Sequence, residues 1–530
     1  MVDIDTLLAS IHLVGQYYQA QLELGMRMLG GDSSHSTVMT TKADRRFDGP
    51  EWKQYPIFDF IRQSYLQTSK ALVDAVEAAQ IDADTKELMR FYTRQLIDAT
   101  SPANFAMTNP EVLTLAAETR GESVVTGLKN LLHDLGEGRI SLSNTKVFEV
   151  GGNLANTPGS VVYENDLIQL IQYSPMTEKV QEIPLLVIPS VVNKFYILDL
   201  TPEASLVRYL VSQGFTVFIV SWRNITPQLQ WRTWDDYVAY GVLNAIEVTR
   251  EISGCEQIGA VGYCVGGALL SSALAVRAAQ GERPVASMTL LMSMLEFSDP
   301  GEIGVYLNPA IIAQRASTYA NGGLVSGKEL TMAFSSLRAN DLVWSFVVNN
   351  YLKGRTPDAF DLFYWNMDDS NLPGPMFAYY LRQCYIENKL VQPDALSMLG
   401  TPVDLGRIGV PTYIFAASDD HLVPWRSAYE SVNHLNGDVE FVLGGGGHIT
   451  GPINPVAKNK RNYWVDGQQG EKPDEWLASA RSLGGSWWPH WAAWLEKQSG
   501  GVIDARSQLG SAMYKEIERA PGRYVTERVR

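Results

Sequence analysis

The sequence predicts an α/β fold in which a mainly parallel sheet lies beneath helices, with a helical region in front of it. From about residue 148 onward, short apolar runs rich in β-branched residues alternate with helical stretches, a pattern typical of parallel strands buried on both faces. Before that point apolar residues recur at helical spacing, without a strand pattern. The 530 residues, 45% of them hydrophobic and 19% charged, are enough to bury a large core.

The helical region covers residues 1–145. Helices are predicted over 5–30, 56–79 and 84–98, where apolar side chains recur every three or four positions. A polar connection over 31–44 is expected to be mobile. Two roles stay open for this region: packing against the α/β core, or dimer stability and the docking of partner proteins.

Buried strands are predicted next, and a long segment interrupts them. The strands cover residues 183–188, 215–220, 257–261, 285–291, 411–416 and 439–443. Between them, residues 296–399 are dense in aromatics and too long to form an ordinary loop. We therefore predict a cap domain at 296–399, inserted between a first core part at 146–295 and a second part with the C-terminal segment at 400–530.

Charge and cysteine content exclude several classes of function. The 43 basic and 58 acidic residues give a net charge of −15, which argues against nucleic acid as a partner. Cys255, Cys264 and Cys384 are too few for a disulfide framework and form no Cys-x-x-Cys pair, so we expect a reducing cytoplasm and no metal site. No apolar run approaches the roughly 18 residues of a membrane span, and the N-terminus lacks the basic part of a signal peptide.

The strongest local signal is Gly-Tyr-Cys-Val-Gly-Gly at residues 262–267. It follows a predicted strand and precedes a helix-prone run, which is the setting of the nucleophile elbow, with Cys264 in place of the usual Ser. Larger side chains at the glycines would collide with the strand and helix. The helix N-terminus favours the thiolate of Cys264, and the Val265 N–H would face an oxyanion. The alternative is a glycine-rich turn holding a structural cysteine.

Two aspartates follow the strand predicted at 411–416 and are candidates for the acid of a catalytic triad. Spacing alone does not choose between Asp419 and Asp420, because Asp419 could instead cap the helix that begins near residue 423. The loop after the strand at 183–188 is the candidate for a second oxyanion donor, through the N–H of Val191 or Val192. An ordinary turn at the strand end is the alternative for that loop.

The candidate base is His448, which follows the strand at 439–443 and four glycines. It would take a proton from Cys264 or from an incoming hydroxyl, while a carboxylate fixes its tautomer. His421, beside the acids, and His434, in a predicted helix, are weaker candidates because neither lies directly after a strand.

The box at 262–267 resembles the Gly-x-Cys-x-Gly-Gly box of the poly(3-hydroxyalkanoate) synthases, which belong to the α/β-hydrolase superfamily. The similarity extends from about residue 40 to the C-terminus, and Val265 resembles the short-chain (class I) type. Further matching segments are residues 44–47, 193–200, 221–224, 350–354, 380–382, 420–425, 447–455 and 520–525.

The resemblance implies an acyltransferase with a Cys-His-Asp triad. Cys264 would carry the acyl chain, His448 would be the general base and Asp420 the third member. The implied reaction joins (R)-3-hydroxyacyl-coenzyme A units, chiefly 3-hydroxybutyryl-coenzyme A, into a growing polyester and releases coenzyme A. A cap, a homodimer, no cofactor, granule-associated partner proteins and a place in the cytoplasm at the surface of polyester granules are also implied.

Individual positions carry further implications of the resemblance. Arg382 matches a cap position at the coenzyme A entrance, where a guanidinium suits phosphate. Thr450 stands where Ala is common and close to the base, so it is expected to shape the acyl pocket. Tyr263 replaces the usual Phe, and Ser190-Val191 replace a Pro-aromatic or Pro-Cys pair.

Two rival functions remain on sequence grounds. A thioesterase or polyester depolymerase would use the same triad with water as the acceptor. A granule-surface binding protein would use the aromatic segments and retain only a vestigial triad.

Overall fold

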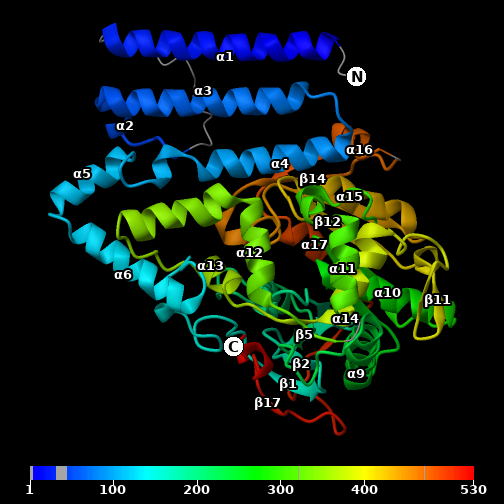
Figure 1. Ribbon diagram of the computed structural model, residues 1–530. Coiled ribbons are helices and arrows are strands. Elements are labelled where there is room, and N and C mark those ends of the chain that lie inside the picture. The colour runs from blue at the N-terminus through cyan, green and yellow to red at the C-terminus, as the bar shows by residue number, and fades with distance from the viewer. Residues whose placement is uncertain (1–3, 31–44, 320–321, 471, 530) are drawn as a thin grey trace. The chain divides into compact units, whose positions relative to one another are not determined.

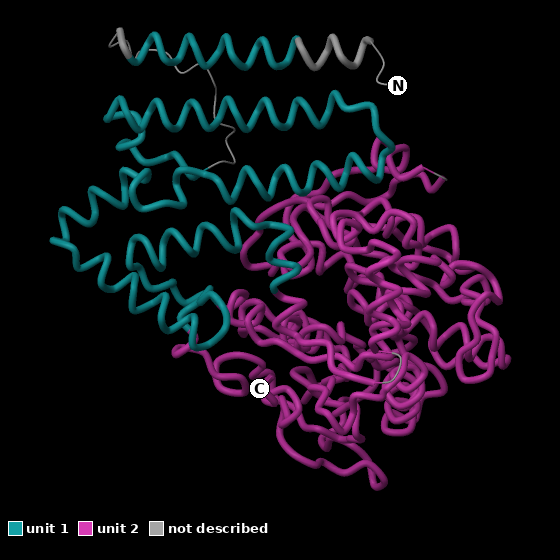
Figure 2. Tube along the Cα trace, viewed as in Figure 1, with its two compact units in different colours: residues 1–144, 332–360 teal, residues 145–331, 361–530 magenta. Residues whose placement is uncertain are grey.

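The computed structural model describes residues 4–30, 45–319, 322–470 and 472–529 (Figure 1). The connection predicted over 31–44 lies outside these residues. The chain forms two compact units: unit 1 consists of Met1–Asn144 and Met332–Phe360, and unit 2 of Thr145–Thr331 and Asp361–Arg530 (Figure 2). The segment predicted as a cap, 296–399, is thus divided between the two units.

Unit 1 is helical, and its described residues contain no strand. The helices predicted over 5–30, 56–79 and 84–98 are present as α1, α3 and α4. Its main helices are α1 (Ile4–Gly30), α2 (Glu51–Gln54), α3 (Pro56–Ala78), α4 (Ala83–Ala99), α5 (Pro110–Glu118) and α6 (Glu122–Glu137). The Asp82 carboxylate caps α4, and the Asn109 side chain caps α5, as these residue types commonly do.

The segment 332–360 is joined to the N-terminal helices of unit 1 by an ion pair and a hydrogen bond. It holds the end of α12 (Gly327–Leu337) and the π-helical turns η6 (Asn340–Trp344) and η7 (Val347–Leu352). The Lys353 ammonium lies 2.6 Å from the Glu111 carboxylate. The Tyr351 hydroxyl donates to Asp134 at 2.6 Å. These bonds explain why a segment from the middle of the chain belongs to unit 1.

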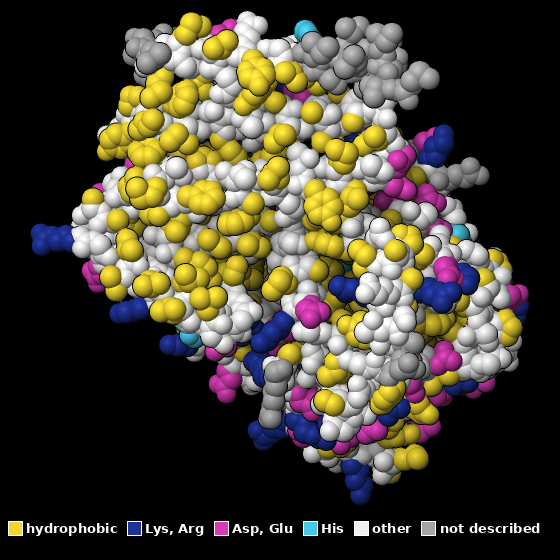
Figure 3. Space-filling model, in the orientation of Figure 1, with side chains coloured by type: hydrophobic (Ala, Val, Ile, Leu, Met, Phe, Trp, Pro, Cys, Tyr) yellow, Lys and Arg dark blue, Asp and Glu magenta, His cyan; other side chains and the backbone are white. Residues whose placement is uncertain are grey.

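Apolar side chains gather on the visible face of unit 1 (Figure 3). On α6 they recur at helical spacing along one side and are more than half exposed. They are Val124, Val125, Leu128, Leu132 and Leu135. A face of this kind commonly marks a contact with another apolar surface.

Unit 2 is built on an eleven-stranded sheet with the order β15-β14-β13-β12-β7-β6-β4-β5-β2-β1-β17. The six predicted strands are all present and form its parallel centre. They are β4 (Leu185–Ile188), β5 (Val217–Trp222), β6 (Ile258–Tyr263), β7 (Val285–Leu291), β12 (Thr412–Ala417) and β13 (Val439–Gly444). The predicted α/β fold class is therefore confirmed.

Antiparallel strands, which the sequence pattern did not reveal, extend the sheet at both ends. They are β1 (Gly159–Glu164), β2 (Ile168–Tyr173), β14 (Asn462–Val465), β15 (Arg481–Gly484) and β17 (Glu518–Arg519). Strand β17 has only two residues and β15 is mostly exposed, so neither presents an apolar run. Strand β2 is fully buried but includes Gln169 and Gln172, whose amides are hydrogen-bonded.

Helices cover both faces of this sheet. Leu186 and Ile188 of β4 belong to an apolar cluster that includes α9 (Asn244–Ser253) and α10 (Val265–Ala279). Leu185 and Val187 belong to another, which includes α7 (Leu206–Ser212) and α17 (Trp488–Gln498). Because successive side chains of a strand point to opposite faces, the parallel centre is buried on both sides.

Shorter elements complete unit 2. The helices are α8 (Trp234–Asp236), α11 (Pro309–Tyr319), α13 (Asp361–Asn366), α14 (Gly374–Tyr379), α15 (Trp425–Glu430), α16 (Pro473–Ser479) and the π-helices η4 (Tyr237–Leu243) and η8 (Tyr380–Ile386). The small paired strands are β3 (Lys179–Gln181) with β16 (Val502–Asp504), β8 (Leu324–Val325) with β9 (Leu372–Pro373), and β10 (Leu396–Met398) with β11 (Thr401–Val403). Within the described residues, no helix has the length and apolar content needed to cross a membrane.

Candidate active site

The predicted site residues follow strands whose carboxyl ends lie at one edge of the sheet. Ile188 of β4 pairs with Gly262 of β6, and Ala417 of β12 pairs with Gly444 of β13. Cys264 follows β6, Asp420 follows β12 and His448 follows β13. Loops at the carboxyl ends of parallel strands are where open α/β sheets bind ligands.

Cys264 occupies a strained turn between β6 and α10. Its backbone has φ 53° and ψ −125°, a conformation that costs free energy for a non-glycine residue. The turn is held because the Cys264 N–H donates to the Leu291 carbonyl at 2.9 Å, and the Ser293 hydroxyl donates to the Cys264 carbonyl at 2.6 Å. This geometry places the thiol immediately before the first turn of α10.

The glycines beside Cys264 are required by close packing. A Cβ at Gly262 would lie 2.4 Å from the Cα of Gly267, and one at Gly266 would lie 2.2 Å from the Ile188 carbonyl oxygen. Both distances are far below van der Waals contact. The absence of side chains at these two positions lets β6, α10 and the loop after β4 approach one another.

His448 and Asp420 form a buried pair. His448 Nδ1 and Asp420 Oδ2 are 2.7 Å apart, and little of either residue is exposed. The other Asp420 oxygen accepts the N–H groups of Leu422 and Val423 at 2.8 and 2.9 Å. These three bonds fix the carboxylate, which in turn orients the imidazole.

The electrostatic surroundings favour a charged His448. Burial alone would lower the pKa of this imidazole, but the negative charges of Asp420 and Cys264, with hydrogen bonds to both, outweigh it and raise the pKa well above its usual value. His448 is thus hydrogen-bonded to the acid and lies within electrostatic range of the thiol. This arrangement can move a proton to and from sulfur.

The other candidates for acid and base have different surroundings. Asp419 is exposed, and its carboxylate accepts from the Ser418 hydroxyl at 3.3 Å. His434 lies 3.3 Å from the Glu296 carboxylate, and His421 is half-buried in the turn after Asp420. Of these side chains, only that of Asp420 is hydrogen-bonded to His448.

Comparison with known proteins decides the family. A family model described as "Poly-beta-hydroxybutyrate polymerase (PhaC) N-terminus" matches residues 43–210, and one described as "alpha/beta hydrolase fold" matches residues 184–455. The poly(3-hydroxyalkanoate) polymerase subunit PhaC of Cupriavidus necator is 49% identical, over 91% of this chain and 83% of its own length. This chain belongs to the poly(3-hydroxyalkanoate) polymerase family. The family resemblance and the predicted α/β-hydrolase core are confirmed, and the protein is an acyltransferase.

Other members of the polymerase family are also similar over nearly the whole chain. The poly(3-hydroxyalkanoate) polymerase of Methylorubrum extorquens is 38% identical, over 97% of this chain and 85% of its own length. Poly(3-hydroxyalkanoate) polymerase 1 of Ectopseudomonas oleovorans is 35% identical, over 96% of this chain and 90% of its own length.

The N–H groups of the two predicted oxyanion donors differ in their hydrogen bonding in this structure. Val265 is the first residue of α10, directly after Cys264, and the first N–H groups of a helix lack partners within it. The Val192 N–H donates to the hydroxyl of Ser190 at 3.2 Å. Ser190 and Val191 stand where the polymerase resemblance predicts a Pro-aromatic or Pro-Cys pair. The bond from Val192 to the Ser190 hydroxyl therefore depends on a residue that departs from the expected pattern.

Three aromatic hydroxyls lie near the thiol, and the sequence analysis named Tyr263 but did not single out Tyr380 or Tyr385. The Tyr263 hydroxyl donates to the His448 carbonyl at 3.3 Å. Tyr385 is partly buried, and burial, with charge interactions that include Cys264, raises its pKa. Tyr380 is partly buried beside it, with ring centroids 5.2 Å apart. The density of aromatics over 296–399 was the available signal, but it did not indicate which of them lie near the thiol.

The other residues named in the sequence analysis lie at different places in unit 2. Arg382 is on η8 with an exposed side chain, 2.7 Å from the Glu387 carboxylate. The Thr450 hydroxyl accepts the Gly447 N–H at 3.2 Å and so shapes the turn that carries His448. Cys384 is buried, and burial raises the pKa of its thiol. Cys255 is partly exposed and contacts the Glu182 carbonyl.

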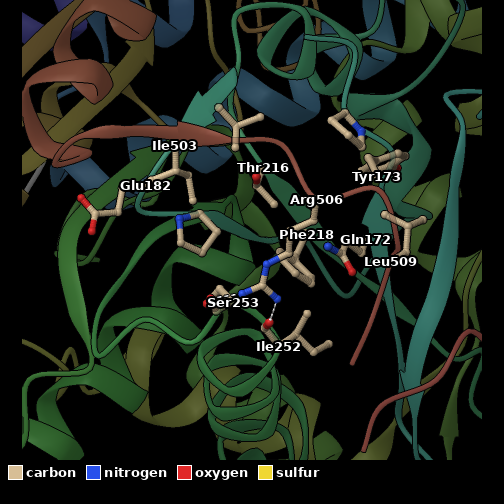
Figure 4. Close-up of a pocket in the computed structure, with 13 residues that line it drawn as sticks. Gln172, Tyr173, Glu182, Thr216, Phe218, Ile252, Ser253, Ile503, Arg506 and Leu509 are labelled. Atoms are coloured by element: carbon tan, nitrogen blue, oxygen red, sulfur yellow. Dashed lines mark hydrogen bonds between the residues drawn. The ribbon is translucent and has the colours of Figure 1, made fainter. Parts of the chain in front are cut away.

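Two cavities contain none of the predicted site residues. A cavity of about 40 Å³ lies near the amino ends of β4 and β5, where the Arg506 guanidinium bonds to the Ile252 carbonyl (Figure 4). It has room for little more than water. A second, of about 590 Å³, lies within unit 1 and is lined by polar groups that include Arg45 and Lys353. Among the residues that the structure describes, no group of three His, Cys, Asp or Glu side chains is arranged to hold a metal ion.

Proposed function

We propose that this protein polymerises (R)-3-hydroxyacyl-coenzyme A, chiefly 3-hydroxybutyryl-coenzyme A, into polyester with release of coenzyme A. The observation that carries the proposal is the buried Asp420–His448 pair, whose imidazole also interacts with Cys264 at the start of α10. In a member of the poly(3-hydroxyalkanoate) polymerase family, this arrangement provides a thiol nucleophile, a base and an orienting acid.

The first step loads an acyl unit onto Cys264. His448 takes the thiol proton, and the thiolate attacks the thioester carbonyl of the substrate. The new carbon–sulfur bond to Cys264 forms as the bond to coenzyme A breaks, and the departing thiolate takes the proton from His448. The N–H group of Val265, together with that of Val192 once it leaves the Ser190 hydroxyl, stabilises the oxyanion between these events. Exchange of one thioester for another is nearly balanced in energy, which suits a thiol nucleophile.

The second step lengthens the chain. The hydroxyl of another acyl unit gives its proton to His448 and attacks the thioester carbonyl on Cys264. An ester bond forms, the bond to Cys264 breaks, and the proton returns from His448 to sulfur. Asp420 holds the imidazole in one tautomer throughout. The scheme uses only groups of this protein and the two acyl substrates, and it requires no cofactor.

Two further residues are assigned to the substrate. The exposed Arg382 guanidinium is suited to a phosphate of coenzyme A, and we propose that it exchanges Glu387 for that phosphate. Thr450 lies two residues after His448, and we propose that it shapes the acyl pocket. Comparing four- to six-carbon 3-hydroxyacyl-coenzyme A substrates with the wild type and Thr450→Ala tests the second assignment.

We propose that the enzyme works as a homodimer in the cytoplasm, at the surface of polyester granules and near granule-associated proteins. The exposed apolar side chains of unit 1 support a contact with a hydrophobic product. Light scattering of the purified protein, with and without substrate, tests the dimer.

Coenzyme A release tests the catalytic thiol. We expect Cys264→Ala to abolish coenzyme A release from 3-hydroxybutyryl-coenzyme A. The matched control, Cys255→Ala, removes a thiol that lies outside the triad and should keep the wild-type rate. An undiminished rate in Cys264→Ala would overturn the assignment.

Product analysis separates polymerisation from hydrolysis. The triad would serve a thioesterase or depolymerase equally well, with water in place of the hydroxyl. We expect insoluble polyester from the wild type, and soluble 3-hydroxybutyrate as the main product would establish a hydrolase instead. Granule binding without any coenzyme A release would favour a binding protein.

A further inference from the structure

The loop after β4, residues 189–194, is held in place by groups from distant parts of unit 2. The Trp222 indole N–H donates to the Pro189 carbonyl at 2.9 Å. The Trp365 indole N–H donates to the Lys194 carbonyl at 2.7 Å. The Lys194 ammonium is buried and donates to the Glu527 carbonyl at 2.8 Å. The end of the chain therefore contacts the loop that carries Val192.

A buried carboxylate connects the end of the chain to the same region. Asp368 is 2% exposed. One of its oxygens accepts the Tyr196 hydroxyl at 2.9 Å, and the other lies 2.5 Å from the Arg528 guanidinium. Arg528 also donates to the Tyr364 hydroxyl at 2.8 Å. Tyr196 lies two residues after Lys194, so Asp368 and Arg528 fix the chain just beyond the loop.

The charges in this cluster depend on one another. Burial lowers the pKa of Lys194, and the charge of Asp368 opposes that shift. Burial raises the pKa of Asp368, and the charges of Lys194 and Arg528 oppose it. A buried charge that loses its partner is destabilised, so removal of Arg528 should disturb the surroundings of Lys194 rather than only the surface.

The final residues are themselves anchored, so they can act as a fixed support. Tyr524 and Val525 are buried, and the Tyr524 hydroxyl donates to the Asn165 carbonyl at 2.9 Å. The Arg223 guanidinium lies over the Tyr524 ring, 4.7 Å from its centre, and 3.2 Å from the Glu527 carboxylate. The contacts to Lys194 and Asp368 thus come from a tail that is tied to the sheet.

We propose that Glu527 and Arg528 are positioning residues for the acyl-transfer reaction. Acting through Lys194 and Asp368, they hold the loop 189–194 so that the Val192 N–H, which donates to the Ser190 hydroxyl at 3.2 Å in this structure, is kept within reach of the developing oxyanion. The inference rests on the proposed function. Oxyanion stabilisation depends on donors that are already in place, and an error of about 1 Å in placement can cost up to about a hundredfold in rate.

The test compares two arginines of the tail in the full-length protein. Arg528 and Arg523 have side chains that are 51% and 49% exposed, and both pair with carboxylates. Arg523 pairs with Glu164 and Glu518, outside the contacts with the loop. We expect Arg528→Gln to lower kcat for coenzyme A release about tenfold with little change in KM, and Arg523→Gln to retain the wild-type kcat.

Two further measurements separate positioning from a general loss of structure. Alkylation of Cys264 by iodoacetamide uses the thiol but no oxyanion donor, so Arg528→Gln should be alkylated at the wild-type rate. Arg528→Lys keeps the charge opposite Asp368 and should recover part of the lost kcat.

Several results would overturn the inference. They are a wild-type kcat in Arg528→Gln, an equal loss in Arg523→Gln, and an alkylation rate that falls in parallel with kcat. A wild-type protein that released no coenzyme A would overturn the proposed function and this inference together. An active wild type with an unaffected Arg528→Gln variant overturns the inference alone.

Discussion

Asp419 and Asp420 are adjacent in the sequence but lie in opposite environments. The Asp419 side chain faces solvent, whereas Asp420 is buried and accepts two backbone N–H groups as well as His448. Residue spacing could place both after a strand but could not choose between them, because the direction of each side chain depends on how the turn closes. The turn closes so that only Asp420 meets the imidazole.

This difference predicts the effect of two matched substitutions. Asp420→Asn should lower kcat for coenzyme A release by at least about a hundredfold, since the imidazole loses the group that fixes its tautomer. Asp419→Asn removes a neighbouring carboxylate and should leave kcat within about twofold. Steady-state kinetics of both variants checks this, and equal losses would contradict the role given to Asp420.

The pH dependence of the same variant has a definite sign. In the wild type, Asp420 and Cys264 raise the pKa of His448 against the effect of burial. With the Asp420 charge removed, burial has more influence and the pKa falls, so neutral His448 persists to lower pH. The acid limb of the pH–rate profile should therefore move to lower pH in Asp420→Asn, and a shift to higher pH would contradict this account.

At the scale of elements, the start of α10 is in direct contact with the loop after β4. A Cβ at Gly266 would lie 2.2 Å from the Ile188 carbonyl oxygen and 2.6 Å from that of Pro189. A side chain there would have to push the helix away from the loop. Because Val265 and Val192 lie on these two elements, any such displacement would separate the two proposed oxyanion donors.

Gly266→Ala is therefore expected to affect both stability and activity. We expect overpacking to destabilise the fold by about 1–3 kcal/mol and kcat to fall by about tenfold or more. Thermal unfolding and coenzyme A release measure the two effects. The control is Gly136→Ala on α6, where a Cβ meets nothing within 4 Å and the higher helix propensity of Ala should leave stability unchanged or slightly raised.

The sequence was most informative where an element has a repeating pattern. The parallel strands β4, β5, β6, β7, β12 and β13 were predicted because burial on both faces makes each an apolar run. The edge strands lack that signal. The elbow at Cys264 was predicted because the strand, turn and helix that require its glycines are all adjacent in the sequence. The contact of Arg528 with Asp368 joins residues far apart in the chain, and no local pattern encodes such a pairing.

At the scale of the whole molecule, the two units are interleaved in sequence. Unit 2 is interrupted by residues 332–360, which belong to unit 1. Removal of residues 1–144 therefore does not separate the two units cleanly. It would remove Glu111, which pairs with Lys353, and Asp134, which accepts from Tyr351. Apolar and charged groups of 332–360 would then lose their partners.

Deletion of residues 1–144 should therefore expose this segment to proteases. We expect limited trypsin digestion to cut within 332–360 of the truncated protein much faster than in the full chain, because local unfolding determines access. A truncated variant that also replaces 332–360 with a short linker should resist digestion. Equal resistance of the full and truncated chains at 332–360 would contradict the division into these units.

The two-residue strand β17 has a consequence for biosynthesis. It pairs with β1 at the edge of the sheet and is made of residues 518–519, near the end of the chain. During translation the N-terminal parts emerge first, so β1 must wait with an open edge until residues 518–519 have been made. The edge of the sheet in a nascent chain thus stays open until β17 has emerged, and nascent chains that still lack β17 should be the form most prone to pair through that edge.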